Sequence, residues 1–429
     1  MPKDTSNGPT IYARRESEAR SYCRSFPVSF TSARGSELTD DEGKTYIDFL
    51  AGCSSLNYGH NDPHMKAALV EHIMSDGIAH GLDMHTDAKE AFLQTFERLI
   101  LEPRGMDHKV MMVGPTGTNA VEAAMKLARK VTGRTNIIAF TNGFHGMTVG
   151  ALAATGNKGK RNGGGMPLQG VTHMPYEGAF GPDVDTLAQI EMMLENPSSG
   201  LDAPAAFLVE PVQGEGGLNA ASAEWLRGIA RLAKKHGALL IADDIQAGIG
   251  RTGTFFSFEE MGVEPDMIPL AKSLSGFGLP FAALLLKPEL DVWKPAEHNG
   301  TFRGNTHAFI TARVALEKFW ADGRFQKSLA EKAQLIEDEL NTIAEMVPGA
   351  YLKGRGLMRG VDVGSGELAG AICAAAFERG LIIETSGADD EVVKVLAPLT
   401  TSEETFRKGF DILRESVATS LNNHKIAAE

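Results

Sequence analysis

Short apolar runs of strand length alternate with longer stretches of helical periodicity between Val110 and about Leu286. The strand-like runs are VMMV (110–113), NIIAF (136–140), AAFLVE (205–210), ALLIADD (238–244) and DMIPLA (266–271), and the helical stretches between them include 119–131 and 222–236. This alternation predicts an α/β fold with a mostly parallel central sheet covered by helices.

The two ends of the chain have a different pattern. The N-terminal part contains a predicted hairpin at 35–48, with its turn at 40–43, and then a helical stretch that begins near Pro63. The C-terminal part is helical over 308–345, then mixes the runs LMRGVDV, LIIE and VVKVLA with helices, and ends in a predicted helix at 402–421. We therefore expect an N-terminal segment (1–70) that packs on a small α+β domain (307–429), and a large domain between them (71–306).

Composition and charge narrow the class of protein. The 429 residues carry a formal net charge of −13, which argues against nucleic-acid binding and against docking on anionic membranes. No apolar run approaches the length needed to span a bilayer, and the N-terminus lacks the apolar core of a signal peptide. The three cysteines, Cys23, Cys53 and Cys373, form no disulfide framework, so we expect a cytoplasmic protein.

Two predicted strands of the central sheet end in side chains that carry chemistry. ALLIADD ends in Asp243 and Asp244, at the sheet edge where open α/β folds bind ligands. DMIPLA leads directly into Lys272, and lysine is seldom buried without a partner. A desolvated lysine has a lowered pKa, becomes nucleophilic and forms an imine with an aldehyde. Pyridoxal phosphate is an aldehyde cofactor that uses such a lysine, with a carboxylate beside its pyridine nitrogen.

Other segments fit the same cofactor less specifically. The run GPTGTN (114–119) follows a strand and opens a helix, which favours a phosphate group, although alone it reads better as an ordinary helix cap. Phe144 in NGFHGMT is placed to stack on a planar ring, although alone it reads better as core packing. His60, His64 and nearby histidines lack an HExxH pattern and cysteine partners, so we expect no metal site.

Together these segments resemble the class III, or ω-, aminotransferases of pyridoxal-phosphate fold type I. The resemblance runs from about Gly35 to the C-terminal helix. The matching segments are DDEGKTYIDF, NYGH, PTGTNAVEAAMKLAR, FTNGFHGMT, VEPVQGEGG, ADDIQAGIGRTG, LAKSLSGFGLP and NGTFRGNTHAF. The family implies fold type I, pyridoxal 5'-phosphate as cofactor, small-molecule substrates, and a homodimer or a dimer of dimers.

The resemblance also implies a role for each matching residue around the cofactor ring. Lys272 is the Schiff-base lysine and moves the proton, and Asp243 pairs with the pyridine nitrogen. Gln246 reaches the phenolic oxygen. Phe144 stacks on the ring and His145 lies beside it.

Further roles concern the phosphate group and the substrate. Gly117 and Thr118 match phosphate-binding residues, and Thr306 matches a threonine that crosses the dimer interface to the neighbour's phosphate. Glu210 matches a glutamate near the substrate, where we expect it to shield the cationic group that binds the glutamate carboxylate.

Four positions are expected to shape the substrate pocket. Three of them differ from the family pattern, and the fourth is an additional arginine. Relatives that use ornithine or 4-aminobutyrate have a carboxylate-binding arginine where this chain has Lys394, which lacks the bidentate fork. TFRGN places Arg303 where the family has glycine. Cys53 stands where ornithine-using relatives have a tyrosine, and Arg24 is an expected carboxylate partner.

Within the family, the runs NGTFRGNTHAF, GCSSLNYGH and VLAPLTT are typical of the members that make diaminobutyrate for ectoine biosynthesis. That likeness implies transfer of an amino group from glutamate to the aldehyde of L-aspartate-4-semialdehyde. Two alternatives stay open. One is another ω-aminotransferase, acting on ornithine, acetylornithine or 4-aminobutyrate. The other is an aminomutase, or a binding protein that retains the cofactor without transfer.

Overall fold

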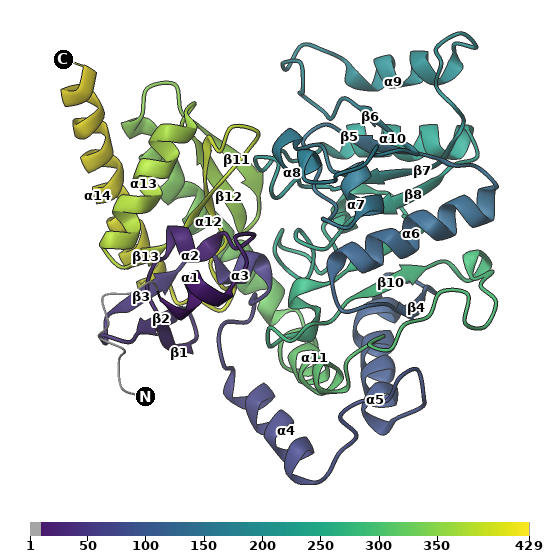
Figure 1. Ribbon diagram of the computed structural model, residues 1–429, viewed down its shortest axis with the longest axis horizontal. Coiled ribbons are helices and arrows are strands. Elements are labelled where there is room, and N and C mark those ends of the chain that lie inside the picture. Colours follow the sequence, from purple (N-terminus) through teal and green to yellow (C-terminus); the bar gives the residue numbers. More distant parts are fainter. Residues whose placement is uncertain (1–9, 429) are drawn as a thin grey trace.

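The computed structural model describes residues 10–428 and is built around a seven-stranded sheet (Figure 1). The order is β4-β10-β9-β8-β7-β5-β6. The strands are β4 (Lys109–Met112), β5 (Asn136–Phe140), β6 (Val171–Met174), β7 (Pro204–Val209), β8 (Leu239–Ala242), β9 (Met267–Leu270) and β10 (Ala283–Leu286). Only β10 runs antiparallel, against both β4 and β9. The predicted mostly parallel sheet is confirmed, and its five predicted strands are present to within a few residues.

Helices cover both faces of this sheet, because each parallel connection must cross over the sheet. The long ones are amphipathic: α6 (Gly117–Thr132) and α10 (Ala223–Lys235) each bury an apolar face. The shorter elements of this part are α5 (Asp87–Phe96), η1 (Glu97–Leu101), η2 (Glu102–Arg104), α7 (Val149–Ala154), α8 (Lys158–Asn162), α9 (Thr186–Glu195), η3 (Glu259–Met261), η4 (Lys272–Ser275) and η5 (Pro288–Leu290).

A second sheet joins the two ends of the chain. Strands β1 (Phe30–Arg34), β2 (Glu37–Asp40) and β3 (Thr45–Asp48) form an antiparallel meander, and β3 pairs in parallel with β13 (Leu381–Ile382). The turn between β2 and β3 lies where the sequence predicts it: Asp40 Oδ1 accepts the backbone N–H groups of Glu42 and Lys44, both at 2.9 Å. The helices of this N-terminal part are α1 (Ile11–Arg15), α2 (Tyr22–Ser25), α3 (Ala51–Ser54) and α4 (Pro63–Met74). Of these, α4 packs against α11 (Thr306–Phe319) and lies away from the strands (Figure 1).

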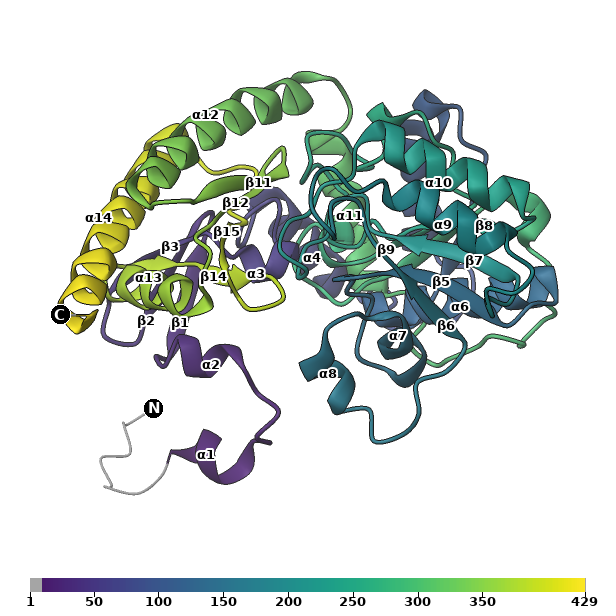
Figure 2. The same ribbon diagram turned by 90° about the horizontal axis from the view of Figure 1, so that it is seen from above.

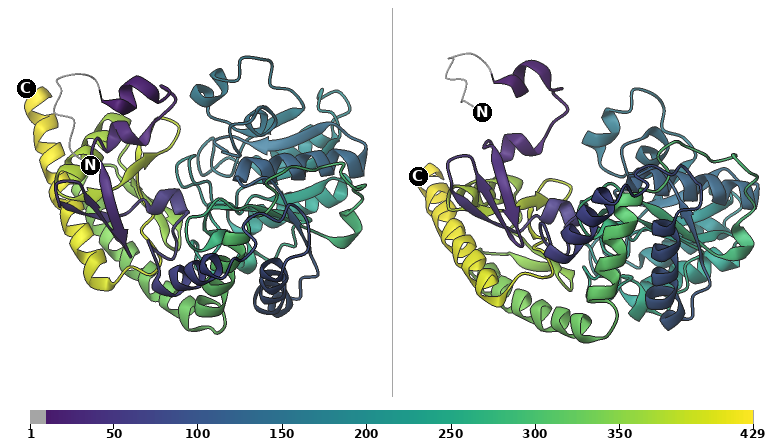
Figure 3. Two further views of the ribbon diagram at one scale, coloured as in Figure 1. Left: turned by 60° about the horizontal axis from the view of Figure 1, so that its bottom comes forward. Right: turned by 90° about the horizontal axis from the view of Figure 1, so that it is seen from below.

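The third sheet belongs to the C-terminal part and has the order β11-β12-β15-β14. Its strands are β11 (Tyr351–Arg355), β12 (Met358–Asp362), β14 (Glu384–Ser386) and β15 (Val392–Val395). Its helices are α12 (Arg324–Met346), α13 (Gly366–Glu378) and α14 (Glu403–Ala428). Figure 2 shows α12 and α14 along the outer side of this sheet. Figure 3 shows the same arrangement of the two lobes from two further directions.

The helical stretch expected at 308–345 is two helices, because the chain breaks between α11 (Thr306–Phe319) and α12. Trp320 leaves helical geometry and its indole N–H donates to the Tyr58 hydroxyl at 2.7 Å in the core. Asp322 then accepts the backbone N–H of Arg324 at 3.0 Å and opens the next helix. This break lies between the two lobes (Figure 1).

We propose that these lobes are the two domains expected from the sequence, divided near residues 70 and 306. The pairing of β3 with β13 supports the packing of the N-terminal segment on the small domain. Residues 1–9 of that segment lie outside the described residues.

Candidate active site

Four neighbouring parallel strands deliver the predicted site residues to one edge of the central sheet. Phe144 and His145 follow β5, Glu210 follows β7, Asp243 follows β8 and Lys272 follows β9. A cavity of about 470 Å³ lies at this edge. Its lining includes Gly117, Thr118, Phe144, His145, Glu210, Glu215, Asp243, Gln246 and Lys272. A cavity of this size suits a small-molecule cofactor with its substrate.

Lys272 has the properties of a nucleophilic amine. Its backbone adopts φ of +50°, which is rare for a residue with a side chain and is found where function holds a residue in place. Burial lowers the pKa of its amine. Its Nζ makes no hydrogen bond or ion pair with any residue between 10 and 428. The amine is therefore free to react with a carbonyl compound in the cavity.

Asp243 is held by a buried histidine. Asp243 Oδ2 lies 2.7 Å from His145 Nδ1, and Asp243 Oδ1 accepts the Ile245 backbone N–H at 3.2 Å. Burial lowers the pKa of His145, but the hydrogen bond and the charge of Asp243 outweigh burial, so that the pKa is raised. The contact with His145 fixes the direction of the Asp243 carboxyl group. Such a carboxylate suits a protonated ring nitrogen.

Glu210 is hydrogen-bonded to the segment that carries Phe144 in the cavity wall. Glu210 accepts the backbone N–H groups of Phe144 at 2.9 Å and Gly214 at 3.4 Å. Burial raises the pKa of Glu210 to about 7. Lys160 Nζ lies 4.6 Å from the centroid of the Phe144 ring. Glu210 thus orients the segment that carries the ring.

The phosphate-binding candidates lie at the start of α6. Thr116 and Asn119 form a capping box, in which the Thr116 hydroxyl donates to Asn119 Oδ1 at 2.7 Å. A Cβ added at Gly117 would lie 3.0 Å from the Ile245 side chain, so a larger residue would crowd the cavity. The Thr118 hydroxyl lies 2.7 Å from that of Thr148. Helix N-termini of this kind favour a phosphate dianion.

Gln246 provides an unused hydrogen-bonding group. Its amide Nε2 donates to the Cys53 carbonyl at 3.3 Å and to Glu215 Oε1 at 3.1 Å. The other end of the amide, Oε1, is buried without a hydrogen-bond partner among residues 10–428. Since Nε2 already donates to two acceptors, the free end is the amide oxygen, which can accept a hydrogen bond from a ligand. Together with the free amine and the held carboxylate, this donor set fits pyridoxal phosphate.

Lys394 is fully buried between two carboxylates. Its Nζ lies 3.0 Å from Glu215 Oε1 and 2.9 Å from Glu384 Oε1. The carboxylate predicted to shield this cation was Glu210, and that assignment is wrong: Glu215, five residues further along the same motif, occupies the position. The lysine charges outweigh burial and lower the pKa of Glu215 to about 2. Both carboxylates outweigh burial at Lys394 and raise its pKa.

The expectation for Arg24 is also wrong. Its guanidinium pairs with Glu18 and with the Arg20 carbonyl, and its side chain is 55% exposed, so it does not enter the cavity. The neighbouring Tyr22 enters the region instead, with its hydroxyl 2.7 Å from Cys53 Sγ. Burial raises the pKa of Cys53 to about 11, so this thiol stays protonated. The side chains of α2 thus face the opposite way from the expected arrangement.

Thr306 begins α11 and is buried outside the main cavity. It lines a neighbouring cavity with Leu82, Phe302 and Arg303. Arg303 donates from Nε to the Met112 carbonyl at 2.9 Å, which ties its loop to the end of β4. The predicted contact of Thr306 with a neighbour's phosphate stays a prediction.

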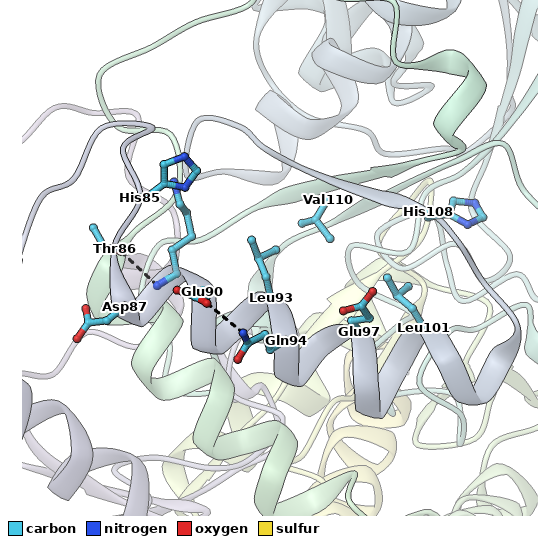
Figure 4. A pocket seen from close by; sticks show the side chains of 11 residues that line it. His85, Thr86, Asp87, Glu90, Leu93, Gln94, Glu97, Leu101, His108 and Val110 are labelled. Carbon is cyan, nitrogen blue, oxygen red and sulfur yellow. Dashed lines mark hydrogen bonds between the residues drawn. The ribbon is translucent and has the colours of Figure 1, made fainter.

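Another cavity, of about 500 Å³, lies along α5 and η1 (Figure 4). It contains none of the predicted site residues. Two of its polar side chains are bonded within the protein: Lys89 donates to the carbonyls of Asp83 and Met84, and Gln94 to Glu90. Among residues 10–428, no group of three His, Cys, Asp or Glu side chains is placed to hold a metal ion. No helix in the same range has the length and apolar character to cross a membrane.

Comparisons with known proteins identify the family of the chain. The family model of class-III aminotransferases matches residues 19–417. A diaminobutyrate–2-oxoglutarate transaminase of Bordetella parapertussis is 55% identical over 98% of this chain and 97% of that protein. The protein of that name from Halomonas elongata is 56% identical over 95% of this chain and 98% of that protein.

Solved structures share the fold. The ornithine aminotransferase of Toxoplasma gondii has a TM-score of 0.82 at 26% identity, covers 96% of this chain and 94% of its own, and is described with PLP at its active site. An S-selective transaminase from Arthrobacter has a TM-score of 0.83 at 23% identity, with 95% and 96% coverage. The chain therefore belongs to the class-III aminotransferases, which are pyridoxal-phosphate-dependent enzymes.

Proposed function

We propose that the chain transfers the amino group of L-glutamate to the terminal aldehyde of L-aspartate-4-semialdehyde, forming L-2,4-diaminobutyrate and 2-oxoglutarate. This reaction would supply the first step of ectoine biosynthesis. We propose a cytoplasmic location as well, since Cys23, Cys53 and Cys373 are all free thiols.

The observation that carries the choice of substrates is the identity of 55% to the Bordetella parapertussis transaminase over nearly the full length of both chains. The site supports it with a buried cation, Lys394, whose charge acts on the Lys272 amine. A glutamate donor carries a carboxylate that this cation can bind once Glu215 moves away from it. Ornithine aminotransferases are similar in fold at much lower identity, 26% for the Toxoplasma gondii protein.

The cofactor, when bound, supplies an electron-withdrawing ring that stabilises negative charge at the carbon from which a proton is removed. Lys272 would bind the cofactor covalently. Asp243 would face its ring nitrogen and Phe144 would stack on its ring. Gly117 and Thr118 would bind its phosphate group. Gln246 has a free amide oxygen, which would accept a hydrogen bond from the phenolic O–H group.

Side chains of the protein move the substrate proton and balance the charges of the site. The Lys272 amine has a pKa lowered by burial, so a neutral Nζ is available to accept a proton from a substrate carbon and return it elsewhere. His145 holds the Asp243 carboxyl group in the direction that the ring nitrogen would need. Glu215 covers the charge of Lys394 while the amino-aldehyde occupies the site, and a glutamate carboxylate replaces it in the other half of the cycle.

We further propose a homodimer, or a dimer of dimers, as the active form. Leu82 and Phe302 line the cavity of Thr306, yet they are 49% and 65% exposed. Exposed apolar side chains beside a buried functional threonine favour coverage by a second copy of the chain.

An amino-acceptor screen with L-glutamate as donor tests the proposed reaction. The acceptors would be L-aspartate-4-semialdehyde, glutamate-5-semialdehyde, N-acetylglutamate-5-semialdehyde and succinate semialdehyde. We expect the first to react fastest and to give 2,4-diaminobutyrate. A faster reaction with another aldehyde would contradict the proposal, and formation of an isomeric amino acid without any keto acid would indicate an aminomutase.

A further inference from the structure

Lys394 has one carboxylate more than its charge requires. Two acidic groups, Glu215 and Glu384, lie at 3.0 and 2.9 Å from a single ammonium group that is 0% exposed. Buried charges are stable only when they are balanced. Since Glu215 is already hydrogen-bonded to both Lys394 and Gln246, the carboxylate in excess is Glu384.

Glu384 has few polar contacts besides this shared ammonium group. Its Oε1 forms the ion pair with Lys394 at 2.9 Å. Among residues 10–428, the contact given for its other oxygen is Cys53 Sγ, at 3.9 Å. A buried carboxylate that shares its cation with a second carboxylate is not fully balanced in charge. A ligand that brings a positively charged N–H donor to Glu384 would supply the missing charge.

The position of Glu384 suits the far end of a short substrate. Cys53 lies beside Glu384, and its carbonyl accepts from Gln246 in the main cavity. The charge of Lys272 also acts on Glu384. In L-2,4-diaminobutyrate only two methylene groups separate the reacting amine from the carbon that bears the α-ammonium and α-carboxylate groups. That head group must therefore bind close to Lys272.

Resting on the proposed function, we infer that Glu384 binds the α-ammonium group of diaminobutyrate while Glu215 continues to balance the charge of Lys394. The positive charge of the α-ammonium group matches the carboxylate in excess. Glu384 is then a specificity residue: it favours donors with a second ammonium group over 4-aminobutyrate, which is diaminobutyrate without its α-amino group.

The test is the substitution Glu384→Gln in the cofactor-loaded enzyme, with three donors and 2-oxoglutarate as acceptor. The donors are diaminobutyrate, 4-aminobutyrate and 1,3-diaminopropane, which lacks only the α-carboxylate. For each we measure kcat/KM, or Ki against diaminobutyrate where a compound is not turned over. We expect diaminobutyrate and diaminopropane to weaken by about tenfold or more, as for loss of a buried charged hydrogen bond. 4-Aminobutyrate should change by less than about twofold.

Glu378→Gln, an exposed carboxylate at the end of α13, is the matched control and should change none of the three donors. An equal effect of Glu384→Gln on all three donors would contradict the inference. A comparable loss of kcat/KM with glutamate as donor would also contradict the inference. It would mean that the role of Glu384 is to position Lys394 and not to bind the α-ammonium group. If the wild-type enzyme itself prefers ornithine or 4-aminobutyrate, the proposed function fails instead, whatever the variant does.

Discussion

Asp243 and His145 form a buried pair at the carboxyl edge of the central sheet, with Oδ2 and Nδ1 2.7 Å apart and both side chains at most 3% exposed. The pair joins the segment after β5 to the end of β8, two strands that are not neighbours in the sheet. His145 thereby fixes the direction of the carboxyl group that we propose for the ring nitrogen of the cofactor.

Replacement of Asp243 by asparagine should keep the fold and lower turnover by several orders of magnitude. Asparagine preserves the shape but cannot keep a ring nitrogen protonated, so the electron sink is lost. The measurement is kcat at saturating substrate, with circular dichroism to check folding. A folded variant with a kcat close to that of the wild type would exclude this role for Asp243.

Lys272 should carry the cofactor. Purified enzyme is expected to be yellow, and borohydride reduction followed by peptide mass analysis should locate the label on Lys272. Lys272→Ala should lose transamination almost entirely, since the same amine moves the proton. Lys160, which lies against the Phe144 ring, is the natural control position. A label on any other lysine would overturn the assignment.

The sequence predicted the central sheet and the residues at its edge because both depend on local patterns. Asp243 and Lys272 directly follow apolar strands, and strands in one parallel sheet bring their ends to the same edge. The family resemblance then gave the roles. The break at Trp320 was not predicted, because the helical pattern continues through it and the cause is a contact with Tyr58 from the N-terminal part of the chain.

The partners of Lys394 could not be found in the same way. Glu215, Glu384 and Lys394 come from three separate segments, and their meeting depends on how the small domain packs against the sheet edge. VEPVQGEGG contains two glutamates, and the pattern alone does not say which one reaches the lysine. Likewise, the short helix α2 has no periodicity that decides whether Tyr22 or Arg24 points inward.

Asp244 should make the stability of the enzyme depend on pH. Burial raises the pKa of Asp244 from 3.8 to about 7 in the folded protein. At a pH between these two pKa values, Asp244 is ionised in the unfolded chain and protonated in the folded protein. The contribution of Asp244 to the free energy of unfolding therefore falls as pH rises to about 7 and is constant above that pH. The Tm of wild type minus that of Asp244→Asn should therefore decrease from about pH 5 to about pH 7. A difference that stays constant or increases over this range would contradict the shift.

Thr306 should act across a dimer interface. Thr306→Val is expected to leave the dimer intact and weaken cofactor binding by about tenfold, as for loss of one hydrogen bond to a charged phosphate. Thr301→Val, on the exposed loop before it, is the control. The measurements are cofactor release and sedimentation under assay conditions. A fully active monomer would refute the dimer proposal.

The most direct test of the whole account is the relative kcat/KM of the wild-type enzyme for L-2,4-diaminobutyrate, ornithine and 4-aminobutyrate, measured in reverse with 2-oxoglutarate. We expect diaminobutyrate to be preferred, with 2-oxoglutarate converted to glutamate and the terminal amine transferred. A preference for ornithine or 4-aminobutyrate of tenfold or more, about 1.4 kcal/mol in transition-state binding, would contradict the account and assign the chain to another ω-aminotransferase reaction.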